Sequence, residues 1–368
     1  MKVLFLANIP SPYRVDFFNE LGKKCELTVL FEKKKADDRE WNTSKYKHFN
    51  CIFLNGIKIS ADTALCFEVI KYLKKSYDFI VIGGYSTPTG MLAIEYLKIK
   101  KKKFILSADG GLIKNEKKIN FLLKRHFIGS AYWWLSTGKM TTNYLKYYGA
   151  SKERIYLYPF SSIRNEQFDQ TEITDEKKNI LKEQLNIKGD KVIISVGQFI
   201  HRKGFDVLLK AVNDLPDNID LYIIGGQPTD EYIKIVEESE FKNIYFKNFM
   251  QPKDLYNFYA ISDLFVLPTR EDIWGLVINE ALSCGLPVIT TDKCIAGVEL
   301  VKKGINGEIV PVNDINKLNE SIKHVLNLSL DKQRIKESVI DVDKVRNDYY
   351  FIDIYKNDEL EKYLFIFE

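Results

Sequence analysis

Short runs of aliphatic residues alternate with helical patterns along the whole chain, and this alternation restricts the fold more than any other feature. Two runs, Lys2–Asn8 and Lys191–Gly197, open alike, and each leads into a turn and a helical pattern. Aliphatic runs in which polar residues do not occupy every second position are typical of parallel strands that are buried on both sides. Strands and helices in alternation indicate βαβ units. The sequence therefore predicts an α/β fold with two doubly wound sheets.

Further elements are expected after each opening run. The first half should add helices over Arg14–Leu21, Ala64–Lys74 and Thr89–Ile99, and strands at Glu26–Phe31, Asp78–Gly83, Phe104–Ser107, Trp133–Ser136 and Ile155–Tyr158. The second half should add strands at Ile219–Gly225, Asn243–Phe246, Asp263–Leu267, Pro287–Thr290 and Glu308–Val310. A length of 368 residues also favours two domains, because a single core stops growing near roughly 250–300 residues.

We expect an N-terminal Rossmann-like domain over residues 1–165 and a C-terminal one over residues 166–349. A surface helix is predicted over Asp175–Leu185, and the flexible joint near Pro159–Arg164. A C-terminal helix over about residues 350–368 should pack back near the N-terminal domain. Two such domains would face each other across a central cleft at the carboxyl ends of their sheets, where α/β proteins bind ligands.

The composition, 45% hydrophobic and 28% charged residues, is typical of a soluble globular protein. No apolar run approaches the ~18–20 residues that span a bilayer, and the N-terminus lacks the long apolar core of a signal peptide. The five cysteines are scattered, which argues against a disulfide framework and for the cytoplasm. The four histidines lack metal-ligand spacing, and Asp341 and Asp343 are interpreted as surface acids. We therefore expect no metal and no cofactor.

Charge is divided unevenly between the two halves. Residues 1–165 hold 29 Lys and Arg against 14 Asp and Glu, a net +15, whereas residues 166–368 hold 25 against 36, a net −11. The basic residues of the first half form two clusters: Lys98, Lys100, Lys101, Lys102 and Lys103, and Lys114, Lys117, Lys118, Lys124 and Arg125. Each such residue contributes about 1 kcal/mol near an anionic bilayer. The clusters favour an anionic membrane surface as partner, with a solvated charged surface as the alternative. No motif indicates nucleic acid.

The stretch Pro268–Ile289 gives the strongest functional signal. Glu271 and Asp272 follow an expected strand, Gly275 opens a helix, and Glu280 lies inside that helix. The N–H groups at a helix start suit a phosphate or a sugar hydroxyl, and Glu280 could accept hydrogen bonds from a diol such as ribose. In the alternative interpretation, the acids only favour the helix start and Glu280 is a solvated surface residue.

A second signal is the loop after Val196, which contains Gln198 and the adjacent cations Arg202 and Lys203. Negative charge develops on a departing diphosphate when its sugar is transferred, and fixed cations stabilise that charge without a metal. Cations at a helix start oppose the helix dipole, so they indicate an anionic partner. A plain pair of surface cations is the alternative.

The stretch Pro268–Ile289 closely resembles the signature of family-4 retaining glycosyltransferases of the GT-B fold. That signature is an acid, seven residues and a Glu, then Ala, a small residue and Gly-x-Pro-Val, and here the spaced pair is Asp272 and Glu280. The usual first acid is Glu, so either Asp272 or Glu271 is expected to contact the donor sugar. The resemblance further implies that Glu280 binds the ribose. The backbone of Gly275, Leu276 and Val277 would meet phosphate or sugar.

The same family places an Arg just after Val-Gly and a Lys five positions later, both on the diphosphate. Lys203 matches the Lys, whereas Gln198 stands at the Arg position, so Arg202 is expected to supply the charge. Weaker donor binding is the alternative. Gly226, Phe249 and Met250 match weaker donor-binding positions of the family.

The resemblance is looser over the N-terminal half, which the family uses to bind the acceptor. Ser11, Tyr13 and Arg14 follow the first strand and are assigned to the acceptor, with Arg14 facing a phosphate or only beginning a helix. Asp109 follows another strand where many relatives carry a His. It would accept a bond from the sugar or take the acceptor proton, and a simple Asp-Gly turn is the alternative.

The resemblance implies transfer of a sugar, with retention, from a nucleotide diphosphate sugar to a glycan or lipid-linked acceptor in bacterial polysaccharide assembly. UDP is the favoured nucleotide, and the site in the cell is the cytoplasm or the inner face of the membrane. Catalytic roles go to Asp109, Lys203, Glu271 and Asp272. The alternatives are a nucleotide-sugar epimerase of the same fold and a non-catalytic nucleotide-sugar-binding protein.

Overall fold

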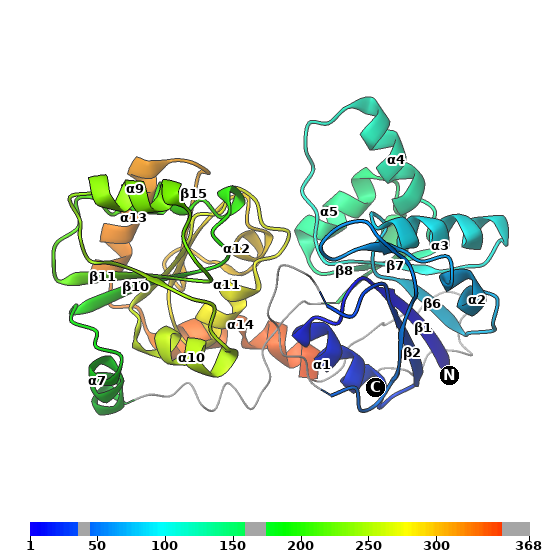
Figure 1. Ribbon diagram of the computed structural model, residues 1–368, viewed down its shortest axis with the longest axis horizontal. Coiled ribbons are helices and arrows are strands. Elements are labelled where there is room, and N and C mark those ends of the chain that lie inside the picture. The colour runs from blue at the N-terminus through cyan, green and yellow to red at the C-terminus, as the bar shows by residue number, and fades with distance from the viewer. Residues whose placement is uncertain (36–44, 159–173, 348–368) are drawn as a thin grey trace. The chain divides into compact units, whose positions relative to one another are not determined.

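The computed structural model describes residues 1–35, 45–158 and 174–347. The chain divides into two compact units, one built on Met1–Phe160 and the other on Ser161–Asn347 (Figure 1). We call them unit 1 and unit 2. The expected joint near Pro159–Arg164, the boundary at residues 165 and 166, and the expected helix over residues 350–368 lie outside the described ranges.

Unit 1 is built on a parallel sheet in which seven strands follow the order β3-β2-β1-β6-β7-β8-β9. The strands are β1 (Lys2–Ala7), β2 (Glu26–Phe31), β3 (Asn50–Phe53), β6 (Phe79–Ile82), β7 (Ile105–Ala108), β8 (Trp133–Ser136) and β9 (Ile155–Leu157). A small antiparallel pair consists of β4 (Ile57–Lys58) and β5 (Ala64–Leu65). The helical segments are α1 (Pro12–Leu21), α2 (Val69–Leu73), α3 (Pro88–Ile99), α4 (Lys118–Ile128), α5 (Lys139–Tyr147) and η1 (Lys152–Arg154).

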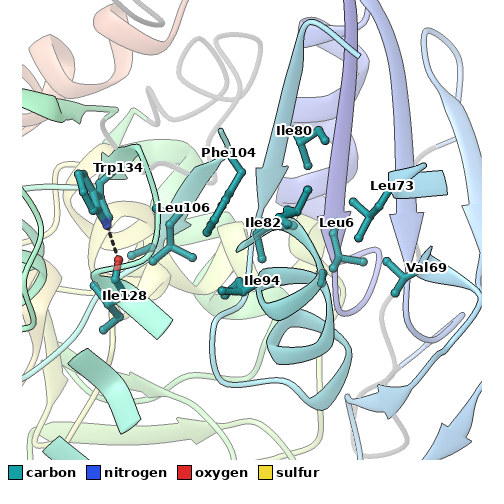
Figure 2. Close-up of a cluster of buried hydrophobic side chains, with 14 of the residues drawn as sticks. Leu6, Val69, Leu73, Ile80, Ile82, Ile94, Phe104, Leu106, Ile128 and Trp134 are labelled. Carbon is teal, nitrogen blue, oxygen red and sulfur yellow. Dashed lines mark hydrogen bonds between the residues drawn. The ribbon is translucent and has the colours of Figure 1, made fainter. Parts of the chain in front are cut away.

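The strands of unit 1 supply its buried core, as their apolar runs predict. Leu6 pairs with Leu30 and Ile82, and the side chains of these strands pack against Ile94 of α3 (Figure 2). Trp134 also lies in this core, where its indole N–H donates a 2.8 Å hydrogen bond to the carbonyl of Ile128. This bond satisfies a buried donor and ties the end of α4 to β8.

One expected helix of unit 1 is wrong in part. Ala64–Lys74 forms the short strand β5 and then the five-residue helix α2. The Oγ1 of Thr89 donates to the carbonyl of Ala64 (2.6 Å) and accepts from the N–H of Cys66 (2.9 Å). The backbone of this segment therefore bonds to α3 instead of closing a helical turn. Strand β3 was missed because it is short and only half-buried.

Unit 2 contains a second parallel sheet, of six strands in the order β12-β11-β10-β13-β14-β15. The strands are β10 (Lys191–Val196), β11 (Ile219–Ile224), β12 (Ile244–Lys247), β13 (Leu264–Leu267), β14 (Val288–Thr291) and β15 (Gly307–Val310). The helical segments are α7 (Asp175–Gln184), η3 (His201–Lys203), α8 (Phe205–Ala211), α9 (Asp230–Glu238), α10 (Pro252–Ile261), α11 (Leu276–Ser283), α12 (Ile295–Leu300), α13 (Ile315–Asn327) and α14 (Lys332–Asn347). The strands expected for this half are confirmed to within about one residue at each end.

Both sheets are doubly wound, which confirms the predicted fold class. Strand order reverses between β1 and β6 in unit 1, and between β10 and β13 in unit 2. In open α/β sheets, ligands bind outside the carboxyl ends of the strands at such a reversal. The loops that follow β10 and β13 are therefore the first place to look for a site in unit 2.

Candidate functional site

Two loops meet at the strand-order reversal of unit 2, and their backbones are in direct contact. Gly204 ends the loop after β10 with a left-handed backbone (φ 69°) and begins α8. A Cβ at this position would lie 2.1 Å from the carbonyl oxygen of Pro268, which follows β13. Only glycine fits both the conformation and the approach. This glycine thus brings the loop after β10, which carries Arg202 and Lys203, against the loop after β13, which carries Glu271 and Asp272.

Hydrogen bonds then hold the two loops together. The backbone N–H of Arg270 and the hydroxyl of Thr269 each donate to the carbonyl of Arg202, both at 2.8 Å. The Arg270 guanidinium donates to the carbonyl of His201 (2.7 Å) and to both carboxylate oxygens of Asp206 (2.8 and 2.7 Å). Such two-pronged pairs fix orientation as well as distance.

Within this frame, the cations and acids predicted from the sequence lie side by side. The Nζ of Lys203 is 2.5 Å from Oδ2 of Asp272, and these side chains are only 13% and 11% exposed. Arg202 places Nη1 3.5 Å from the other Asp272 oxygen and donates to the carbonyl of Glu271 at 2.8 Å. Two cations therefore converge on one carboxylate at the carboxyl edge of the sheet, and a diphosphate could bind to the same cations.

Helix α11 starts directly beside this cluster. Gly275 precedes it with a left-handed backbone (φ 96°), and no side chain caps the helix start. A Cβ on Gly275 would lie 2.9 Å from Sγ of Cys294. The close approach places the first helical residues, Leu276 and Val277, next to Asp272, where helix N–H groups favour an anion.

Glu280 lies one turn further along α11 and is half-buried. The hydroxyl of the buried Tyr259, on α10, donates a 3.0 Å hydrogen bond to its Oε2. Burial and the neighbouring carboxylate raise the pKa of Tyr259, so its hydroxyl stays a donor. Glu280 therefore has a fixed partner inside unit 2. Tyr259 is one polar partner of its carboxylate, and Lys203 contacts Asp272.

The remaining donor-binding candidates also follow strands of the unit 2 sheet. Gln198 is half-buried in the loop after β10, and Gly226 lies two residues beyond the end of β11 with open space where a side chain would lie. Phe249 is exposed and Met250 half-buried in the segment after β12. The topology thus brings the donor-binding candidates to one edge of one sheet.

The candidates in unit 1 form a second, partly buried cluster. Arg14 is buried and makes an ion pair with Asp109, and its Nη1 donates a 3.3 Å hydrogen bond to the hydroxyl of Tyr158. The Tyr158 hydroxyl lies 3.1 Å from Oδ1 of Asp109. Ser11 is buried immediately before α1, and Tyr13 is half-buried. Arg14 therefore faces a carboxylate of its own unit.

Sequence reasoning missed three residues that hold these groups: Tyr158, Tyr259 and Arg270. Tyr158 ends an expected strand, and Arg270 directly precedes the two acids, so position alone could have pointed to both. Tyr259 lies on a helix that carries no motif. Its contact with Glu280 depends on how α10 and α11 pack.

Two kinds of feature are absent from the described part of the chain. No group of three or more His, Cys, Asp or Glu is arranged there to hold a metal ion. The side chains of Asp341 and Asp343 are not included in that part. No helix within the described ranges is both long and apolar enough to cross a membrane.

Comparison with solved structures concerns the whole fold. The crystal structure of Anabaena Alr3699/HepE in complex with UDP aligns with a TM-score of 0.73 at 15% identity, over 94% of this chain and 95% of that chain. WaaG, a glycosyltransferase involved in lipopolysaccharide biosynthesis, aligns with a TM-score of 0.64 at 17% identity, over 96% of each chain. The chain has the GT-B fold. At these identities, the likeness establishes architecture and not substrate.

Sequence comparison gives a family-model match within unit 2 of this GT-B chain, and matches to curated relatives. Residues 176–341 match the family model of glycosyl transferases group 1. The lipopolysaccharide glucosyltransferase WaaG of Escherichia coli K12 is 26% identical over 202 residues, 52% of each chain. The O-antigen biosynthesis glycosyltransferase WclY of Escherichia coli is 22% identical over 310 residues, 79% of this chain and 80% of WclY. Among the most similar curated relatives, the chain spans only 28% to 52% of their length.

Proposed function

We propose that this chain is a glycosyltransferase that moves a sugar from a nucleoside diphosphate sugar to a hydroxyl of a glycan or lipid-linked acceptor in bacterial polysaccharide assembly. The observation that carries the proposal is the convergence of Lys203 and Arg202 on Asp272 at the strand-order reversal of unit 2. The group 1 family match and the names of WaaG and WclY support the reaction class. HepE has been crystallised with UDP and with UDP-glucose, which favours a UDP-sugar as donor.

In the proposed reaction, the bond between the anomeric carbon and the leaving phosphate oxygen breaks. The acceptor oxygen bonds to the same face of that carbon, and its proton passes to the leaving phosphate oxygen, so configuration is retained as in family 4. Lys203 and Arg202 stabilise the negative charge that develops on the diphosphate. These cations remove the need for a metal or a cofactor in the proposal.

The acids would orient the donor. Asp272 or Glu271 would accept hydrogen bonds from hydroxyls of the transferred sugar, because both lie beside the cations that bind the phosphates. Glu280 would accept hydrogen bonds from the ribose, and Tyr259 would hold it in position. The backbone at Gly275, Leu276 and Val277 would contact phosphate or sugar at the start of α11.

In unit 1, we propose that Asp109 orients a sugar hydroxyl. Its side chain is 30% exposed, and one of its oxygens is already bound to Arg14. Arg14 is buried, so we assign it to holding Asp109 in place and not to binding a phosphate. Ser11 and Tyr13 stay assigned to the acceptor because Ser11 ends the loop after β1 and Tyr13 lies in the first turn of α1, at the carboxyl edge of the unit 1 sheet.

The test is a panel of nucleoside diphosphate sugars, scored first by thermal shift. A ligand at 100 times its Kd should add about 2.7 kcal/mol of stability. The ligand that binds is then incubated with candidate acceptors, release of free nucleotide is measured, and the anomeric configuration of the product is read by NMR. A product with the donor's configuration supports the proposal, and an inverted product contradicts retention.

Two outcomes would favour the alternatives. Conversion of the nucleotide sugar to its epimer without any acceptor would indicate an epimerase of this fold. Stabilisation by a nucleotide sugar without release of nucleotide to any acceptor would indicate a binding protein. Absence of stabilisation by every member of the panel would overturn the donor assignment itself.

We further propose that the enzyme works in the cytoplasm at the inner face of the membrane. The support is the net charge of +15 over residues 1–165, which suits an anionic surface.

A further inference from the structure

Helix α4 of unit 1 leaves its apolar residues in solvent. Ile119, Leu122 and Leu123 are 65%, 50% and 51% exposed, and Ile128 is the buried residue of this helix. Their spacing of three and four places them on one face. Three adjacent large aliphatic side chains on a surface helix indicate a contact with something apolar.

The exposure follows from the way α4 is fixed to its unit. Phe121 packs edge-to-face against Tyr147 at 5.4 Å, and Lys124 makes a 2.8 Å ion pair with Glu116. Figure 1 shows α4 at the periphery of unit 1, beside α5. The helix is therefore held along one side while the face that bears Ile119, Leu122 and Leu123 points outward.

Basic residues surround this apolar face. The helix carries Lys118, Lys124 and Arg125 and no acidic residue, and Lys114 and Lys117 precede it. Lys117 and Lys118 are exposed at the helix start, where positive charge opposes the helix dipole. An anion at this end would offset that cost.

Charges from α3 reach the same region. The Nζ of Lys98 lies 3.0 Å from Nε2 of His126, and Ile99 beside it is 74% exposed. Glu95 is the acid that faces this end, 2.5 Å from His126. The surface of α4 is thus an apolar strip with a basic border, to which α3 adds further lysines.

We propose that α4 lies in the interface of an anionic phospholipid bilayer, with Ile119, Leu122 and Leu123 inserted at the acyl boundary and the surrounding Lys and Arg bound to lipid phosphates. An apolar face with a cationic border matches a layer of phosphates above an apolar interior. A nucleic acid would instead call for aromatic residues that stack on bases. The inference rests on the proposed function, because a lipid-linked acceptor would be reached from this surface.

The experiment is co-sedimentation of the purified full-length chain with vesicles of phosphatidylcholine alone or with phosphatidylglycerol. We expect binding to the anionic vesicles that weakens as salt rises. The variant Leu122→Ser/Leu123→Ser should lower the partition coefficient at least about tenfold, because apolar contact is lost. The matched control is Phe67→Ser, which removes another exposed apolar side chain of unit 1 and should bind like the wild type.

A second measurement places the helix directly. Tryptophan introduced as Leu122→Trp should be quenched by brominated lipids, whereas Phe67→Trp should not. Equal vesicle binding by the wild type and the double serine variant would overturn the inference. Equal quenching at positions 67 and 122 would overturn it as well.

Nucleotide-sugar binding separates this inference from the proposed function. Variants of α4 should keep the thermal shift with the donor. A wild-type protein that binds the donor but not the anionic vesicles would overturn the α4 proposal alone, and a wild-type protein that binds the vesicles but no donor would overturn the transferase proposal alone.

Discussion

Tyr259 and Glu280 form a specific contact within the proposed donor site. The tyrosine is buried on α10 and donates to Oε2 of Glu280 at 3.0 Å, so one carboxylate oxygen has a fixed orientation. A neutral hydrogen bond of this kind contributes about 1 kcal/mol net. In the proposed function, this hydrogen bond would matter because it holds Glu280 in position to bind the ribose.

We expect Tyr259→Phe to raise the KM for the donor about fivefold while kcat stays within about twofold, since about 1 kcal/mol of ground-state positioning is lost. Steady-state kinetics with the donor found in the panel measures this. Tyr245→Phe, which removes a hydroxyl from β12 of the same sheet, is the control and should behave like the wild type. A fall in kcat with unchanged KM would contradict the positioning role.

Glu32 of unit 1 gives a prediction about pH. The side chain is buried, accepts hydrogen bonds from the hydroxyl of Thr87 (2.6 Å) and the N–H of Ala64 (3.2 Å), and burial raises its pKa to about 7. The folded state therefore holds a proton that the unfolded chain releases near its ordinary pKa of 4.5. Stability from this group is present below pH 4.5 and is lost as pH rises to about 7.

The loss should be on the order of 3 kcal/mol between pH 4.5 and 7, at about 1.4 kcal/mol per pKa unit. Glu32→Gln keeps a neutral side chain at every pH. The thermal midpoint of the wild type should therefore fall relative to that of the variant as pH rises from 4.5 to 7. Parallel pH curves for the two proteins would refute the buried, protonated state.

Individual contacts were the hardest features to predict. The pairing of Lys203 with Asp272 follows from a motif, because each residue occupies a recognisable place beside a strand end. The contact of Arg14 with Asp109 joins residues 95 positions apart. The local sequence around Arg14 does not show whether its guanidinium pairs with a carboxylate of the protein or binds a phosphate, so sequence reasoning left both roles open.

At the scale of elements, the two loops of unit 2 act as one structure because Arg270 joins them. Its guanidinium binds Asp206 through two oxygens at the start of α8, and both side chains are mostly buried. The same residue contacts the carbonyls of His201 and Arg202. The position of Lys203 relative to Asp272 therefore depends on this link.

We expect Arg270→Lys to lose the two-pronged pair, to destabilise unit 2 by about 1–3 kcal/mol and to lower kcat/KM about tenfold or more. Chemical denaturation and donor turnover measure the two effects. Lys323→Gln breaks the 2.6 Å ion pair with Asp214, which is largely exposed, and should change stability by less than about 1 kcal/mol. Equal effects of the two substitutions would show that the link has no special role.

Elements were predicted well where apolar runs are long and buried. The strands of unit 2 agree because the central runs, such as β10 and β11, are buried on both faces, and burial fixes the pattern. The segment Ala64–Lys74 failed because the hydroxyl of Thr89, 23 residues from Cys66, binds its backbone. Such a tertiary bond overrides local helical spacing.

At the scale of the whole molecule, the chain is two units with separate cores and opposite charge. The two doubly wound sheets were predictable because both repeat the same alternation of strands and helices, whereas the GT-B fold was implied by the family resemblance of Pro268–Ile289. Two units with their own cores need not unfold in one step. The proposed donor contacts lie in unit 2.

We therefore expect a nucleoside diphosphate to raise the unfolding midpoint of unit 2 and to leave that of unit 1 unchanged. Hydrogen exchange with mass spectrometry, followed across the thermal transition, assigns each midpoint to its unit. Stabilisation of unit 1 with unit 2 unaffected would place the nucleotide elsewhere.

The central claim is that Lys203 and its neighbours bind the diphosphate of an activated sugar, and titration calorimetry with UDP tests it most directly. The wild type should bind UDP, Lys203→Gln should weaken binding at least about tenfold, and Lys210→Gln, an exposed lysine on α8, should bind like the wild type. Equal affinity of Lys203→Gln and the wild type would contradict the account.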